Sequence, residues 1–204
     1  MLQKQFITLK KNDLICLATG NAGKIKEFNA MLPSHEIISY KEIVDKELPE
    51  ETGSSFIENA IIKARFVSQH TNSMVLSDDS GLIVPELNYI PGIYSARFAG
   101  PNATDIENRL KLQGLIKQTG KEFLPAYFVC LLVLFRFRDD PLPLITTGKM
   151  HGFVSTQEKG QQGFGYDKMF YLDDKSSTLA SIDAVIKNSI SHRAKALKKL
   201  IASI

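Results

Sequence analysis

Cysteine is scarce in this chain, which has two cysteines and no tryptophan in 204 residues. Cys16 and Cys130 each lie within an apolar run, so we expect two buried, reduced thiols. The chain has no CxxC motif and no Cys/His cluster. These absences exclude a structural zinc site built on the usual ligand spacing.

Long apolar runs are also absent. The longest, around residues 126–135, is too short to span a bilayer. The first twenty residues carry lysines but no apolar stretch of the length found in a signal peptide. We therefore expect a cytoplasmic protein with no membrane partner.

Net charge is small as well. The 25 basic and 22 acidic residues leave a formal charge of +3, and the basic residues form no long run. A nucleic-acid-binding module is disfavoured, because such modules carry a basic stripe. The slight positive excess is compatible with a small anionic substrate.

The order of apolar patterns predicts an α/β fold with a mixed sheet. Residues 1–12 are expected to be a polar N-terminal extension, and residues 13–204 a single domain. Strands are expected over residues 14–18, 35–40, 74–76, 82–84, 127–137, 142–150 and 166–172, with a turn at 77–81. Helices are expected over residues 24–32, from Ser54 or Ser55 to about 67, over 104–117, and from Ser191 onward.

The segment TGNAGK, residues 19–24, joins a buried strand to a helix. Its glycines allow close approach of the backbone to a ligand, and a helix N-terminus attracts phosphate. Lys24 adds a positive charge at the same end. The spacing is too short for a Walker A loop, and Ile25 replaces its Ser/Thr. A phosphate site and an ordinary glycine-rich turn with a solvated lysine are equally supported by this segment alone.

Acidic residues occur in two places, at Glu50 and Glu51 and at Asp78 and Asp79. Several carboxylates in one cleft bind Mg²⁺ well, and one of them can accept a proton from water. Because adjacent side chains on a strand point to opposite faces, Asp78 and Asp79 are expected to do different work. For an isolated DDSG motif, a polar turn is the simpler interpretation.

An aromatic residue stands between glycines in GFGYD, residues 163–167. A purine can stack on Phe164, a contact worth about 1–3 kcal/mol in single-strand binders. Asp167 can accept from a sugar hydroxyl or a base N–H. The alternative is the start of a strand with core aromatics, and for Tyr166 that alternative is favoured.

A further polar group lies near the C-terminus, where Lys187 precedes Ser191, His192 and Arg193. Arg193 can donate to a carbonyl or a phosphate, and His192 can donate or change its charge. Taken alone, Ser191 is an ordinary helix N-cap with exposed charges behind it. For Lys63, a contact with triphosphate and a solvated or salt-bridged side chain are both open.

Together these segments resemble the inosine triphosphate pyrophosphatase family, the XTP/dITP diphosphatases, and its bacterial branch in particular. The resemblance is carried by LATGNAGKIKEF, EETGSSFIENAIIKAR, SDDSGLIV, PGIYSARFAG, GFGYD and ISHRAKALKKL, and it extends over nearly the whole chain from about Leu14. It implies a long mixed β-sheet flanked by helices, in two lobes around a central cleft, and a homodimer.

The resemblance also implies an activity and a set of roles. The activity is Mg²⁺-dependent hydrolysis of ITP, dITP and XTP to monophosphate and pyrophosphate. Asp79 is implied as the catalytic base, and Glu51 (rather than Glu50) and Asp79 as the metal ligands. The residues implied to bind the nucleotide are Thr19, Gly20, Asn21, Ala22, Gly23, Lys24, Ser80, Phe164, Gly165, Tyr166, Asp167, Lys187, His192 and Arg193.

Two other functions remain possible from the sequence. One is a Maf-like pyrophosphatase for modified pyrimidine nucleotides. The other is a nucleotide-binding module without catalysis, which the paired carboxylates disfavour, because they repel a triphosphate unless a metal is present.

Overall fold

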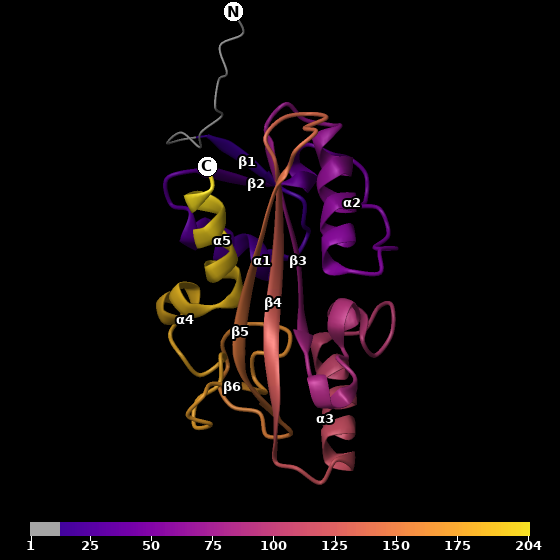
Figure 1. Cartoon of the computed structure of the whole chain (residues 1–204), viewed down its shortest axis with the longest axis vertical. Coiled ribbons are helices and arrows are strands. Elements are labelled where there is room, and N and C mark those ends of the chain that lie inside the picture. The colour runs from indigo at the N-terminus through magenta and orange to yellow at the C-terminus, as the bar shows by residue number, and fades with distance from the viewer. Residues whose placement is uncertain (1–12) are drawn as a thin grey trace, which may run out of the picture. The chain divides into compact units, whose positions relative to one another are not determined.

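A computed structural model describes residues 13–204 of the chain, and the extension expected at residues 1–12 lies outside this range. The strands and longer helices follow in the order β1 (Leu14–Leu17), α1 (Ala22–Met31), β2 (Glu36–Ser39), α2 (Phe56–Ser68), β3 (Met74–Ile83), α3 (Asp105–Gln118), β4 (Phe123–Phe135), β5 (Leu144–Ser155), β6 (Phe170–Tyr171), α4 (Ala184–Ile190) and α5 (His192–Ala202). Figure 1 shows them coloured along the chain.

The strands form one six-stranded sheet with the order β2-β1-β3-β4-β5-β6. Strand β1 is parallel to both of its neighbours, with Cys16 opposite Ile38 on β2 and Val75 on β3. Strands β5 and β6 are antiparallel. The sheet is therefore mixed, and the α/β class expected from the sequence is confirmed. The continuous apolar run of β1 follows from its central place, since a parallel strand covered on both faces has no polar side.

The residues divide into two compact units. The described part of unit 1 comprises residues 13–79, 131–147 and 196–204, and unit 2 comprises residues 80–130 and 148–195. Each has a core of its own. The core of unit 1 includes Cys16, Ala60, Ala64, Val75 and Phe135, and the core of unit 2 includes Leu82, Leu112, Phe128, Met169 and Phe170. The expected central cleft and single-domain boundaries stay predictions.

Strand β3 corrects one expectation. The turn predicted at residues 77–81 does not form, and the strand runs unbroken over Met74–Ile83. Polar and glycine residues there favour a turn locally, but Asp78 and Asp79 are buried, at 2% and 6% exposure. Pairing within the sheet outweighs the local preference, and the two carboxylates are held on a rigid element.

The structure differs from the sequence prediction in two further ways near the C-terminus. The strand predicted over residues 166–172 is only Phe170–Tyr171, because residues 164–169 fold into turns through bonds such as Met169 N–H to the Tyr166 carbonyl at 3.0 Å. Helix α4 was not predicted. It is short and contains Val185 and Ile186, whose β-branched side chains weaken the helical signal.

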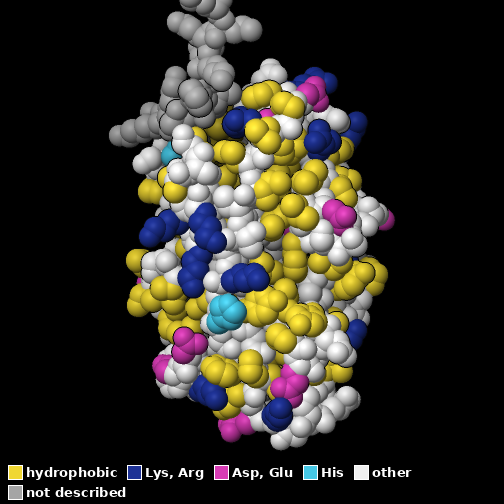
Figure 2. Space-filling model, in the orientation of Figure 1, with side chains coloured by type: hydrophobic (Ala, Val, Ile, Leu, Met, Phe, Trp, Pro, Cys, Tyr) yellow, Lys and Arg dark blue, Asp and Glu magenta, His cyan; other side chains and the backbone are white. Residues whose placement is uncertain are grey.

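Among residues 13–204, no helix is long and apolar enough to cross a membrane. Figure 2 shows one face of the molecule, where apolar side chains are exposed among charges of both signs.

Candidate phosphate and base sites

The loop after β1 is ordered by its own side chains. The Thr19 hydroxyl accepts from the Asn21 N–H at 3.2 Å, and the Asn21 side chain accepts from the Lys24 N–H at 3.0 Å. Asn21 is thereby the N-cap of α1. Gly20 precedes α1, and Ala22 and Gly23 are its first two residues, so little side-chain bulk surrounds the helix N-terminus. A phosphate site at this N-terminus stays a prediction.

Asp78 holds the side chain of Lys24. The Lys24 Nζ lies 2.8 Å from Asp78 Oδ1 and 3.4 Å from its carbonyl oxygen. The Asp78 side chain is only 1% exposed, whereas that of Lys24 is 15% exposed. A buried carboxylate therefore fixes a cation that still reaches the surface beside the α1 N-terminus.

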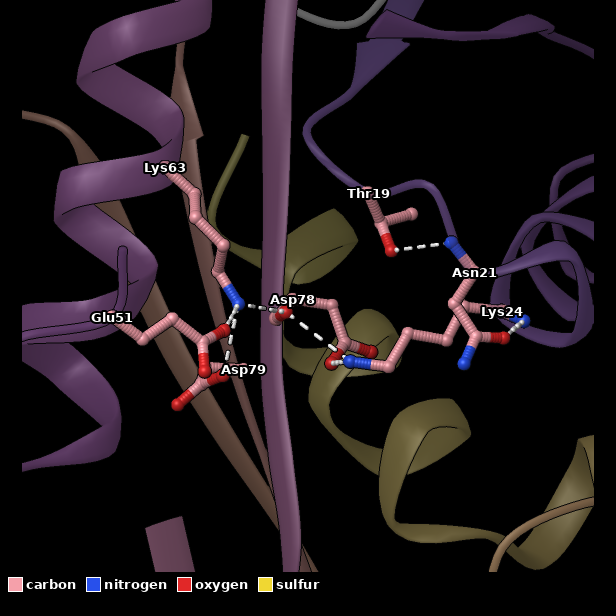
Figure 3. A network of polar contacts seen from close by, with 7 residues as sticks. All are labelled: Thr19, Asn21, Lys24, Glu51, Lys63, Asp78 and Asp79. Carbon is pink, nitrogen blue, oxygen red and sulfur yellow. Dashed lines mark hydrogen bonds and ion pairs between the residues drawn. The ribbon is translucent and has the colours of Figure 1, made fainter. Parts of the chain in front are cut away.

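Asp79 points to the other face of β3, as Figure 3 shows. There the Lys63 Nζ, on α2, lies 2.9 Å from Asp79 Oδ1, 2.7 Å from Glu51 Oε1 and 3.1 Å from the Asp78 carbonyl. The predicted division of work between Asp78 and Asp79 thus has a structural basis: the first orients Lys24, and the second belongs to a group with Glu51 and Lys63. Glu50 is exposed, so the geometry favours Glu51 over its neighbour.

Burial and charge shift the pKa values in this group. Burial, the largest effect, raises the pKa of Asp79 to about 6, and Glu51 adds to the rise, while Lys63 and Lys24 oppose it. Burial alone would lower the pKa of Lys63, but the carboxylates of Asp79 and Glu51 reverse this, so that its pKa is raised. Lys63 therefore stays a cation, and Asp79 can exchange a proton near neutral pH.

The group offers oxygen ligands suited to Mg²⁺. Asp79 Oδ2 is buried and has no hydrogen-bond partner within residues 13–204. In that part of the chain, no three His, Cys, Asp or Glu side chains come together as a metal site. Glu51 and Asp79 are thus a pair of carboxylates, and Mg²⁺ commonly takes one or two carboxylates with waters and substrate phosphates. The residues present fit that ion.

The second cluster lies in unit 2, around Phe164. Lys187 Nζ lies 5.0 Å from the centre of the Phe164 ring, and the Arg193 guanidinium carbon lies 5.8 Å from it. Asp167 Oδ2 accepts from Lys187 Nζ at 2.6 Å and from the Phe164 N–H at 3.0 Å. Gly163 has a φ of +76°, and a Cβ there would clash with the Asp167 carboxyl. The structure therefore brings Phe164, Gly165, Asp167, Lys187 and Arg193 together.

Tyr166 and His192 are also buried in unit 2. The Tyr166 hydroxyl donates to the Ser95 carbonyl at 2.8 Å, and the side chain is buried. These contacts give Tyr166 a structural role. The His192 ring stacks on Phe128, with centroids 4.8 Å apart and an interplanar angle of 13°. Ser80 follows Asp79 on β3 and is half-buried.

The sequence analysis left Lys63 undecided and gave Asp78 no specific partner. A signal for Lys63 was present: it occupies the same helical stripe as Ala60, Ala64 and Val67, all of which are buried. A lysine on an apolar stripe is rarely buried without a charged partner. The ionic contacts themselves were not visible, because they join residues 12 and 16 positions apart.

Comparison with known proteins identifies the family. The sequence profile of the Ham1 family matches residues 15–203. The chain belongs to the Ham1 family. This result confirms the resemblance found in the sequence.

Relatives within the Ham1 family are similar over almost their whole length. A dITP/XTP pyrophosphatase of Legionella pneumophila is 49% identical over 188 residues, covering 92% of this chain and 96% of that protein. One from Haemophilus influenzae is 43% identical, covering 91% and 96%. The solved HAM1 protein of Coxiella burnetii has a TM-score of 0.82 at 39% identity, covering 94% and 98%. The Staphylococcus aureus Ham1 protein has a TM-score of 0.80 at 38% identity, covering 94% and 97%.

Proposed function

We propose that this Ham1 family member hydrolyses non-standard purine nucleoside triphosphates to the monophosphate and pyrophosphate in a Mg²⁺-dependent reaction. The observation that carries the proposal is the buried Asp79 carboxylate of β3, which lies beside Glu51 and has one oxygen without a hydrogen-bond partner among the residues that the structure describes. The names of its relatives, dITP/XTP pyrophosphatases, support the substrate class.

Each group in unit 1 has a task in this proposal. Lys24 and the free N–H groups at the α1 N-terminus neutralise phosphate charge. Asp79 takes the proton of the water that attacks the α-phosphorus, because an ionised carboxylate can act as a general base. Mg²⁺ held by Glu51 and Asp79 would supply charge neutralisation for the pyrophosphate leaving group. Positioning and charge are sufficient, without a covalent intermediate.

The unit 2 cluster supplies base recognition in the same proposal. Phe164 stacks on the purine, and Asp167 accepts from a sugar hydroxyl or a base N–H. Arg193 donates to O6, which inosine and xanthine present as an acceptor and adenine replaces with an amino donor. A buried donor facing another donor costs about 1–3 kcal/mol, which corresponds to roughly ten- to a hundredfold discrimination. The biological role would be to clear deaminated purine nucleotides from the precursor pool.

The first test is Mg²⁺-dependent pyrophosphate release from ITP by wild-type protein and by Asp79→Asn. The variant should lose nearly all turnover, because the amide cannot accept the water proton. It should still bind nucleotide. Asp45→Asn, an exposed carboxylate of unit 1, is the matched control and should retain full activity. Full activity in Asp79→Asn would remove this residue from the reaction.

A substrate panel separates the remaining alternatives. ITP, dITP and XTP should be turned over about ten to a hundred times more efficiently than ATP. A preference for modified pyrimidine triphosphates would instead indicate the Maf-like activity. Binding without pyrophosphate release at any Mg²⁺ concentration would indicate a nucleotide-binding module. A homodimer and a cytoplasmic location are further expectations that accompany the family resemblance.

A further inference from the structure

Helix α3 holds the backbone of the loop that carries Phe164. The Asp105 Oδ2 accepts from the Gly165 N–H at 2.6 Å, and the Arg109 Nη1 donates to the Gly165 carbonyl at 2.8 Å. Both polar groups of the residue next to Phe164 are thus bonded to one helix, although 60 and 56 positions in the chain separate the partners. Neither Asp105 nor Arg109 is among the nucleotide-binding residues assigned above.

Arg109 is buried and firmly oriented. It is 7% exposed, and its Nε donates to Glu158 Oε1 at 2.8 Å. Gln113, one turn further along α3, also donates to Glu158 Oε1, at 3.2 Å. A buried ion pair adds little net stability compared with apolar side chains of the same size. The planar guanidinium does, however, fix the orientation of the Arg109 side chain, because its Nε bonds to Glu158 while its Nη1 bonds to the Gly165 carbonyl.

The loop backbone on either side of Phe164 has wide conformational freedom of its own. Phe164 stands between Gly163 and Gly165, whose φ angles are +76° and +59°. Glycine gives the backbone wide freedom on both sides of the ring. Within the loop, the Phe164 N–H bonds to Asp167, but Gly165 obtains its partners from α3. The position of the Phe164 ring relative to Lys187 and Arg193 therefore depends on contacts from outside the loop.

We infer that Asp105 and Arg109 are positioning residues that hold the Phe164 ring in place for a purine base. The inference rests on the proposed function, in which Phe164 stacks on the base. Loss of the α3 contacts should therefore weaken nucleotide binding and leave the chemistry at Asp79 unchanged.

The experiment compares the KM and kcat for ITP of Arg109→Met with those of wild type. A mispositioned ring should lose part of its stacking on the base, so KM should rise about five- to twentyfold, with kcat changed by less than about twofold. Lys111→Met is the matched control: Lys111 also lies on α3 and donates to a backbone carbonyl, that of Phe98 at 2.5 Å. Its KM should stay at the wild-type value.

A double-mutant cycle with Phe164→Ala tests whether Arg109 acts through the ring. Once Phe164 is removed, Arg109→Met should cause no further rise in KM, because coupled residues are not additive. An equal rise in both backgrounds would overturn the inference, as would an unchanged KM in Arg109→Met while Phe164→Ala raises it. If Phe164→Ala leaves KM unchanged, base stacking in the proposed function fails, and the inference fails with it.

A second readout does not depend on activity. The chain has no tryptophan, so Phe164→Trp introduces a single indole that reports on this loop. Its fluorescence anisotropy should fall when Arg109→Met is added and stay constant when Lys111→Met is added; equal anisotropy in all three proteins would contradict the inference. Arg109→Lys keeps a buried cation able to reach the Gly165 carbonyl. It should restore part of the wild-type KM and serves as the test variant if Arg109→Met does not fold.

Discussion

The ammonium group of Lys63 lies between two carboxylates inside unit 1. The Lys63 and Asp79 side chains are 7% and 8% exposed, and that of Glu51 is 24% exposed. The Lys63 ammonium neutralises part of the negative charge of the two carboxylates. Without it they would repel each other strongly, because they are poorly solvated. Lys63 therefore stabilises the acidic pair in the protein without metal.

Lys63→Met should lower the free energy of unfolding by about 3–5 kcal/mol, because it leaves buried carboxylates without their counterion. Thermal unfolding in the presence of EDTA measures this loss. Added Mg²⁺ should recover part of it, since a bound cation stabilises the folded state and neutralises the same oxygens.

The control for this prediction is Lys41→Met. Lys41 pairs with Glu47 at 3.3 Å, but the two side chains are 55% and 84% exposed. An exposed pair contributes about 0–1 kcal/mol, so the change should be small and independent of Mg²⁺. If the two variants unfold alike, the buried group does not have the role assigned to it.

Among single residues, the sequence identified those whose chemistry follows from a local motif. Lys24 follows a glycine turn, and Asp79 sits in a pair whose division of work depends only on strand alternation. The contacts of Asp105 and Arg109 with Gly165 could not be predicted, because the partners are 60 and 56 positions apart in the chain. Thr104 and Glu107 explain the start of α3 by themselves, and nothing local marks the inner face of that helix as a support.

At the scale of elements, the loop before α2 brings Glu51 into place by close packing. Gly53 donates its N–H to Asn59 Oδ1 at 2.8 Å. A Cβ at Gly53 would lie 2.6 Å from the Glu58 Cβ and 2.7 Å from Asn59 Oδ1, a separation that real Cβ atoms do not show. The loop that carries Glu51 therefore requires glycine at this point.

Gly53→Ala should lower the free energy of unfolding by about 1–3 kcal/mol through overpacking, and should weaken Mg²⁺ binding because Glu51 is displaced. Urea unfolding and metal titration by calorimetry measure the two effects. Gly114→Ala is the control with the same chemical change. Gly114 is exposed in the middle of α3 with open space around it, so alanine should stabilise by about 0.5–1 kcal/mol. Changes of the same sign would refute the packing argument.

The connection from β4 to β5 depends on Asp140. Its carboxylate accepts from Arg136 Nε and Nη2, both at 2.8 Å, and from the Leu142 N–H at 3.0 Å. Burial alone would raise the pKa of Asp140, but the bonds from Arg136 and the backbone outweigh it, so the pKa is lowered. A lowered pKa in the folded state means that the ionised form stabilises the fold.

This stabilisation should be present above the unfolded-state pKa of about 3.9 and be lost as the pH falls through the lower folded-state value. Asp140→Asn should therefore lose about 1–3 kcal/mol at pH 7 and show a weaker decline in stability on acidification. Urea unfolding between neutral and acidic pH measures both. Asp139→Asn should behave as wild type, because the Asp139 side chain is 74% exposed and lies 3.8 Å from Arg138.

Elements were predictable where periodicity and end signals agree. Helix α3 matches the sequence prediction to within a residue, because Thr104 and Glu107 form a capping box. Strand β3 was split in two and β6 was extended too far. Turn-forming residues in β3 are overridden by neighbouring strands, and the aromatic residues before β6 belong to turns that side chains such as Asp167 stabilise.

For the whole molecule, the chain passes between units 1 and 2 four times, at residues 79/80, 130/131, 147/148 and 195/196. Neither unit is one continuous segment, so no single cut yields either of them as a fragment. The sequence predicted the α/β class and the family. It did not predict this interleaving, because each apolar run indicates only that it is buried and not which core it joins.

Strand geometry also limits how this protein can change in length. The Asp78 carboxylate pairs with Lys24 and the Asp79 carboxylate with Lys63 because consecutive side chains of β3 point to opposite faces of the sheet. Inserting or deleting one codon between Met74 and Asp78 would turn the lysine-holding carboxylate toward α2 and the other toward α1. Side chains along this strand can change during evolution, but insertions or deletions of single residues should be selected against. The exposed residues 101–102 should tolerate such changes in length.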